Sequence, residues 1–239
     1  MSATETNATD SRVIPGVGRL DFTETEKRRE YWLLPEGNTR RQRLPSVTGI
    51  LRDTWPKPAL LQWYARLGAD AKTALEEASL RGKAVHKFVE TYCKTGDLLP
   101  FDTCPDAWHP YLRGAATFLW EFDPKPVAVE RLVCHPEMRY AGRLDLIAYL
   151  ADAPDLLTLC DFKSNPKGAV YPEAHVQSVG YVIADERCGG EPIARTMVVG
   201  LDENGGVNPV VGNDHEARKV WASALDFYAQ LKRLEKALA

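Results

Sequence analysis

The sequence of 239 residues lacks several features that would place it in a class at once. Its five cysteines include no C-x-x-C pair, so neither a zinc site nor a disulfide framework is indicated, and a reducing cytoplasm is expected. No apolar run approaches the roughly 20 residues of a membrane helix, and the first residues lack the basic-then-apolar pattern of a signal peptide. There is also no Gly-rich phosphate loop, no G-x-S-x-G nucleophile elbow and no internal repeat.

An excess of basic residues is absent as well. The net charge of −3 gives no overall attraction to nucleic acid. A nuclease is still compatible with it, because the acids of a metal site and a local basic groove can sum to nearly zero. The hydrophobic content of 44% and charged content of 26% indicate an ordinary globular protein, and the length favours one large domain with accessory helices.

The pattern along the chain predicts an α/β fold with a central mixed sheet flanked by helices. A polar, flexible tail is expected over residues 1–20, and one domain over 21–239. That domain divides into an N-terminal hairpin and helices (21–125), a core (126–201) and a C-terminal turn and helix (202–239). The first hairpin is expected to turn at Gly37-Asn38. Helices are expected after an N-cap at Ser46, after Pro58, and over 69–94, 105–122, 172–187 and 214–238.

The segment from Tyr140 to Asn165 is the most informative part of the chain. Two apolar, β-rich runs flank the short loop 151–155, which predicts an antiparallel hairpin. Asp145 and Asp161 are equally far from the centre of that loop, so they are expected to face each other across the two strands. Lys163 follows two residues after Asp161 and is expected on the same face, because side chains alternate along a strand.

Two facing carboxylates in an apolar setting repel each other unless one is protonated or a cation bridges them. Mg²⁺ or Mn²⁺ is the natural cation, because it prefers oxygen ligands and needs only one or two carboxylates besides water and phosphate. A neighbouring lysine can orient a water nucleophile or stabilise charge on a phosphate. The alternative is a plain salt bridge between Lys163 and the aspartates.

Other polar residues occupy positions from which they could join such a site. His86 lies beside the apolar stripe of the helix over 69–94, with Glu90 one turn later; it is either a satisfied core histidine or a metal ligand with an orienting partner. Glu130 interrupts an apolar strand, as an edge acid or a site acid. Gln177 and Tyr181 are four residues apart on a helix and can reach the same ligand.

The basic residues near the first hairpin and after the central hairpin have two possible roles. Arg40, Arg41 and Arg43 form a strip beside Trp32, and Lys167 lies in the loop after the second central strand. They form either a solvated basic face or a contact to the DNA backbone.

The order of these elements resembles a known family. The motifs R-G-x-x-x-H at Arg81, G-R-x-D at Gly142, D-F-K at Asp161 and Q-x-x-x-Y at Gln177 are similar to those of the PD-(D/E)XK nuclease superfamily. Within it, they resemble the branch that holds the RecB nuclease domain, the CRISPR-adaptation exonucleases and their phage relatives. The resemblance covers roughly residues 31–201.

The resemblance implies roles for individual residues. The expected catalytic set is Asp145, Asp161, Lys163, Gln177 and Tyr181. The expected metal ligands are His86, Asp145, Asp161 and the main-chain carbonyl of Phe162, with Glu130 and Glu90 as further acids of less defined role. The residues expected to contact DNA are Arg40, Arg41, Arg43, Ser46, Arg81 and Lys167.

The implied function is a divalent-metal-dependent DNA exonuclease of recombination or end processing, similar to stand-alone phage enzymes. An endonuclease and a catalytically inactive DNA-binding subunit remain open alternatives. The expected cofactor is Mg²⁺ or Mn²⁺. Many of the CRISPR-adaptation nucleases that the chain resembles hold an iron–sulfur cluster with one upstream cysteine and three C-terminal ones. Only Cys188 follows the catalytic motifs here, so no cluster is expected. The expected partners are DNA ends and a recombinase, single-strand-binding protein or helicase.

Overall fold

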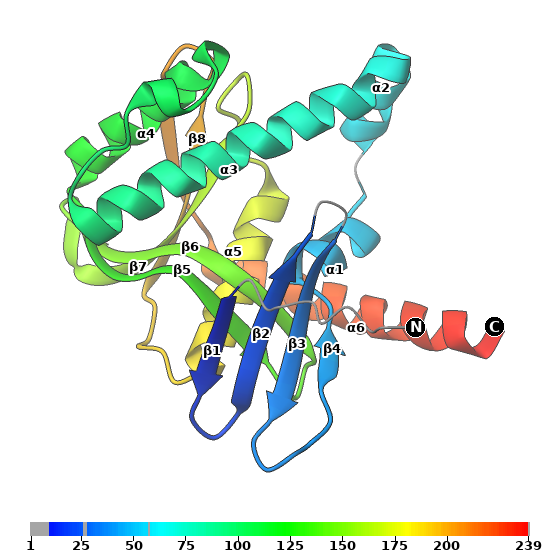
Figure 1. The fold of residues 1–239 in the computed structure, drawn as a ribbon. Helices are drawn as coiled ribbons and strands as arrows, with labels where there is room; N and C mark the ends of the chain where they lie inside the picture. The colour runs from blue at the N-terminus through cyan, green and yellow to red at the C-terminus, as the bar shows by residue number, and fades with distance from the viewer. Residues whose placement is uncertain (1–9, 26–27, 57, 239) are drawn as a thin grey trace, which may run out of the picture.

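The structure, a computed structural model, describes residues 10–25, 28–56 and 58–238 (Figure 1). These residues form an α/β fold with two β-sheets, a mixed sheet of five strands and an antiparallel sheet of four. Helices flank the mixed sheet, and the smaller sheet lies beside it (Figure 1). The predicted class, an α/β fold with a mixed sheet flanked by helices, is confirmed at this level.

The mixed sheet has the order β5-β6-β7-β8-β9. Only β7 and β8 run parallel within it, and they are joined by a crossover through helix α5, as a parallel pair requires. The end of β7 therefore lies close to the start of α5. The bounds are β5 (Lys125–His135), β6 (Tyr140–Leu150), β7 (Ala153–Ser164), α5 (Pro172–Arg187), β8 (Arg195–Leu201) and β9 (Val207–Val211).

Two groups of helices cover the two faces of this sheet. On one face, α1, α5 and α6 enclose a core around the fully buried Trp221. On the other face, α3 and α4 pack on the sheet, where Phe118 meets Phe162 edge-on at 5.2 Å. None of the helices, over the described residues, is both long enough and apolar enough to cross a membrane. Their bounds are α1 (Val47–Thr54), α2 (Pro58–Leu67), α3 (Ala71–Thr95), α4 (His109–Phe122) and α6 (Asp214–Leu238).

Local signals at the helix ends act as the sequence predicts. The hydroxyl of Ser46 accepts a hydrogen bond from the Gly49 N–H at 2.9 Å and so caps α1. Helix α3 ends at Gly96, whose φ of 81° suits glycine. Gly82 does not break α3, which runs through it without interruption.

The N-terminal region is more ordered than the sequence suggests. The smaller sheet has the order β1-β2-β3-β4, with β1 (Asp10–Ile14), β2 (Gly18–Glu24), β3 (Arg29–Pro35) and β4 (Gln42–Leu44). The expectation of a flexible tail over residues 1–20 is therefore wrong for residues 10–20, and residues 1–9 lie outside the described ones. The polar sequence hid these strands because their few apolar residues, such as Leu20 and Phe22, alternate with polar ones and are buried against β5 and β6.

The central hairpin has the expected register but a shorter turn. Strand β7 begins at Ala153, so the loop is shorter than the expected 151–155. A register shift between Ala148 and Leu150 compensates for this difference. As a result Leu146 lies opposite Cys160, and the next position brings Asp145 opposite Asp161.

Two glycines that belong to the motifs differ in how much space surrounds them, and this difference predicts opposite effects on stability. A Cβ at Gly142 would lie 2.4 Å from Cε1 of Tyr181, a ring that is 5% exposed. Gly142→Ala should therefore lower the free energy of unfolding by about 1–3 kcal/mol. A Cβ at Gly82 would meet only the Ser164 hydroxyl at 4.0 Å. Gly82→Ala should therefore raise the free energy of unfolding by up to about 1 kcal/mol.

Urea denaturation measures both variants against the parent chain. Equal midpoints for Gly142→Ala and the parent would contradict the close contact with the tyrosine ring.

Candidate metal centre

Three acidic side chains lie side by side on neighbouring strands of the mixed sheet. On one side of β6, the register places Glu130 of β5 opposite Asp145. On the other side, the strand pairing ends at Leu146 and Cys160, and Asp161 of β7 is the next position, opposite Asp145. Asp145 and Asp161 are 7% and 1% exposed. The sheet thus concentrates negative charge in a poorly solvated place, where each carboxylate needs a positive partner.

The backbone at Glu130 is strained. Its φ is 48°, in the left-handed region that residues with a Cβ rarely adopt, although it lies in the middle of a strand. Such a conformation costs about 1–3 kcal/mol and persists where the surroundings impose it, often at functional sites. Here the Glu130 carboxylate lies 3.3 Å from Nδ1 of His86.

Asp145 is held by both of its carboxylate oxygens. Oδ2 accepts a hydrogen bond of 2.8 Å from the main-chain N–H of Phe162. This side-chain contact links β6 to β7 just beyond Leu146 and Cys160, where the pairing of the two strands ends. Oδ1 lies 3.3 Å from Nδ1 of His86. Burial alone would raise the pKa of Asp145, but His86 and Lys163 lower it overall.

His86 reaches this group from helix α3. Burial alone would lower the pKa of His86, but the carboxylates of Asp145 and Glu130 raise it to about 10. The protonated imidazole is therefore a positive partner for the acids, and the interpretation of His86 as a simple core histidine does not describe its surroundings. A cation bound here would take over that role and displace the proton, as metal binding to histidine requires.

Asp161 belongs to a second network, which contacts α5. Its Oδ2 lies 2.7 Å from the Lys163 ammonium, and its Oδ1 accepts a hydrogen bond of 3.0 Å from the Gln177 amide. The same amide nitrogen lies 3.2 Å from the hydroxyl of Tyr181. The four residues that the sequence places on one side of β7 and one face of α5 are thus in contact.

Charge in this second network is also balanced locally. Burial raises the pKa of Asp161 to about 6, with Lys163 acting in the opposite direction. Burial alone would lower the pKa of Lys163, but the two aspartates raise it, so the amine keeps its proton at neutral pH. Oδ2 of Asp161 is shielded from solvent, and among the described residues its partner is the Lys163 ammonium.

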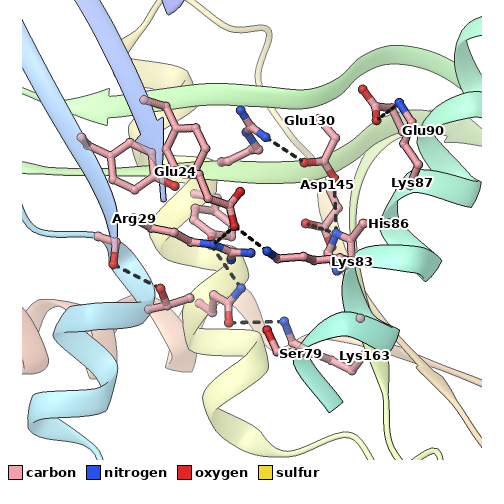
Figure 2. Close-up of a pocket in the computed structure, with 18 of the residues that line it drawn as sticks. Glu24, Arg29, Ser79, Lys83, His86, Lys87, Glu90, Glu130, Asp145 and Lys163 are labelled. Atoms are coloured by element: carbon pink, nitrogen blue, oxygen red, sulfur yellow. Dashed lines mark hydrogen bonds and ion pairs between the residues drawn. The ribbon is translucent and has the colours of Figure 1, made fainter. Parts of the chain in front are cut away.

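The two networks open into one pocket of about 510 Å³. Helix α3 forms one wall, the N-terminal sheet the opposite wall, and α5 the base (Figure 2). Asp161 and Phe162 lie behind the lining, buried in the sheet. Of the residues expected from the sequence, the pocket is lined by Ser46, His86, Glu90, Glu130, Asp145, Lys163, Gln177 and Tyr181.

The donor set fits a divalent cation. One ligand atom each from His86, Glu130 and Asp145 can be chosen so that all lie within 4.8 Å of one another. One imidazole nitrogen and two carboxylate oxygens suit Mn²⁺, and Mg²⁺ accepts the carboxylates with water. The further acid Glu130 belongs to this group, whereas Asp161, expected as a direct ligand, is engaged with Lys163.

Glu90, the other further acid, does not join this group. It pairs with Lys94 at 2.5 Å and with Lys87 at 3.1 Å along α3, and these cations lower its pKa against the effect of burial. Glu90 therefore lies at the pocket wall as part of an ion-pair network of the helix.

Most of the residues expected to contact DNA lie outside the pocket. Arg41 pairs with Asp21 at 2.9 Å, and Arg43 pairs with Glu30 at 3.0 Å. Arg40 is exposed beyond them. Two of the three arginines of this strip, Arg41 and Arg43, are thus paired with acids of the N-terminal sheet.

The two remaining basic residues also have other surroundings. Arg81 donates to the Ser164 carbonyl at 3.1 Å and lies over the ring of Tyr111 at 4.5 Å. Lys167 is exposed in the loop that follows β7. Ser46 is the one member of the expected DNA-contacting set that lines the pocket.

The sequence analysis missed five charged residues of the pocket: Glu24, Arg29, Lys83, Lys87 and Arg143. Two of them carried a signal. Arg143 is the arginine of the G-R-x-D motif, and Lys83 precedes His86 by three residues on one helix face. Glu24 and Arg29 carried none, because their approach depends on where the N-terminal sheet docks.

No protein-family model and no curated protein matches the chain. The chemistry of the described side chains is therefore the basis for a functional proposal.

The strain at Glu130 predicts that glycine is more stable than alanine at this position, which is the reverse of the usual order in a strand. Within a strand, glycine is normally less stable than alanine by roughly 0.5–1 kcal/mol. At a φ of 48° the backbone favours glycine, so Glu130→Gly should unfold at a higher urea concentration than Glu130→Ala. Urea denaturation of both variants in EDTA measures this difference. A higher urea midpoint for Glu130→Ala than for Glu130→Gly would contradict the strained backbone.

Proposed function

We propose that this chain is a divalent-metal-dependent deoxyribonuclease of the PD-(D/E)XK superfamily and that it acts as an exonuclease. One observation carries the proposal. The candidate metal ligands His86, Glu130 and Asp145 open into the same pocket as Lys163 and Gln177. Ligands for a hard cation beside a protonated lysine are what the hydrolysis of a phosphodiester needs.

The order of elements supports the superfamily assignment. A helix with His86 precedes three strands that carry Glu130, Asp145 and Asp161, and the next helix carries Gln177. These elements meet at one place, although they span nearly a hundred residues of sequence. A structural salt bridge between Lys163 and an aspartate would not require this convergence.

Each side chain has a task that follows from its position. Asp145 and Glu130, with His86, would hold the cation on the pocket side of the sheet. A bound cation lowers the pKa of a coordinated water and offsets charge on the phosphate. Lys163, protonated and fixed by Asp161, would donate to the attacking water or to a phosphate oxygen. Gln177 keeps the lysine and Asp161 in place through hydrogen bonds of 3.4 and 3.0 Å.

The size of the pocket favours strand ends as substrate. A volume of about 510 Å³ is that of a small-molecule site. The pocket is also walled on opposite sides by α3 and by the N-terminal sheet. An end of one strand can enter such a space more easily than an uninterrupted duplex can.

Cleavage of end-labelled linear DNA and of closed circular DNA tests the proposal directly. With Mg²⁺ or Mn²⁺ the parent chain should degrade linear DNA and leave closed circles intact, and EDTA should stop the reaction. Lys163→Gln and Asp145→Asn should each lower the rate by about 100-fold or more, because they remove groups that stabilise charge in the transition state.

Lys125→Gln is the matched control, since Lys125 pairs with Asp123 at the exposed start of β5 and does not line the pocket. Nicking of closed circles would replace the exonuclease by an endonuclease. Near-normal activity of Lys163→Gln, or metal-dependent loss of DNA in every variant, would contradict the assignment.

A further inference from the structure

An ion-pair bridge joins the two walls of the pocket. The Lys83 ammonium of α3 lies 2.7 Å from Oε1 of Glu24 at the end of β2. The Arg29 guanidinium at the start of β3 lies 3.0 Å from the same oxygen. In Figure 2, dashed lines join Glu24 to both cations, on the opposite side of the view from Glu130, Asp145 and His86. All three residues line the pocket.

The bridge lies next to the candidate metal ligands. Lys83 precedes His86 by three residues on α3, so both side chains share a helix face and are offset by about 4.5 Å along the helix axis. One wall of the pocket thus presents a metal ligand and a phosphate-binding type of cation at neighbouring positions. Lys163 and Arg143 add positive charge on the sheet side of the same pocket.

The geometry around Glu24 is that of an anion site. Two cations from facing elements converge on one oxygen, which is how lysine and arginine bind a phosphate oxygen. The Glu24 carboxylate is the anion that occupies this place in the structure. Burial alone would raise its pKa, but Lys83 and Arg29 lower it, so the group is ionised at neutral pH.

We propose that Lys83 and Arg29 form a phosphate-binding subsite beside the metal centre, and that Glu24 occupies it until a nucleic-acid phosphate displaces its carboxylate. The subsite rests on the proposed nuclease function, since it positions the strand whose phosphodiester is cut. Glu24 acts as an internal competitor, and its negative charge disfavours weakly bound anions.

The bridge is weak enough to be exchanged. The side chains of Glu24, Arg29 and Lys83 are 27%, 55% and 49% exposed. Ion pairs this accessible contribute little to stability, because water and salt screen them. A phosphate offers both cations several oxygens at once and keeps the charge balance, so the exchange needs no rearrangement of the backbone.

Binding of DNA without cleavage separates this subsite from catalysis. The probe is a fluorescein-labelled single-stranded oligonucleotide in EDTA, and the readout is fluorescence anisotropy with the full chain over a range of salt concentrations. Glu24→Gln should bind about two- to fivefold more tightly than the parent, because the competitor loses its charge. Lys83→Gln should bind more weakly, with a salt slope smaller by about 1.

Glu216→Gln and Lys219→Gln are matched controls, since they interrupt an exposed ion pair of 2.8 Å on α6 and change the net charge equally. Both control variants should bind the oligonucleotide with the same affinity as the parent chain. Equal effects of Glu24→Gln and Glu216→Gln on affinity would overturn the subsite. The nuclease function would then still be tested by the cleavage assay alone.

The remaining outcomes are also decisive. Tighter binding by Glu24→Gln in a chain that cuts no DNA would contradict the nuclease function and support the subsite. If neither the parent nor Glu24→Gln binds the oligonucleotide, the subsite is overturned.

Discussion

Repulsion among the closely spaced carboxylates of the mixed sheet is the constraint on which the rest of the site depends. The sheet sets Glu130, Asp145 and Asp161 in one row, and two unit charges about 5 Å apart repel by roughly 3 kcal/mol at an effective dielectric constant of 20. His86 balances the first two acids and Lys163 balances the third. A divalent cation would balance the first pair more strongly than the histidine does, which is why the arrangement suits a metal.

The sequence alone predicted the parts of this site that depend on short-range periodicity. Asp161 and Lys163 are two residues apart on a strand, and Gln177 and Tyr181 are four apart on a helix, so each pair had to share a face. The facing of Asp145 and Asp161 followed from their symmetry about the hairpin turn. It held although the turn is shorter than expected, because the register shift restores the pairing.

The rest depended on how distant elements dock. Nothing local shows that α3 crosses the sheet so as to bring His86 to Glu130, or that a mid-strand residue adopts a φ of 48°. The N-terminal sheet was hidden by its polar sequence, and with it the wall that brings Glu24 and Arg29 to Lys83. These residues turn an open acidic row into a walled pocket that contains the candidate metal ligands and the ion-paired Lys83 and Arg29.

The most direct test of this account is a calorimetric titration of the metal-free chain with Mn²⁺. The account predicts saturable binding that is lost in Asp145→Asn and kept in Asp123→Asn, a control that neutralises an exposed carboxylate paired with Lys125. Binding should also release a proton from His86, so the measured heat should depend on the ionisation enthalpy of the buffer. Equal Mn²⁺ affinity in both variants, or no binding by the parent chain, would contradict the metal centre.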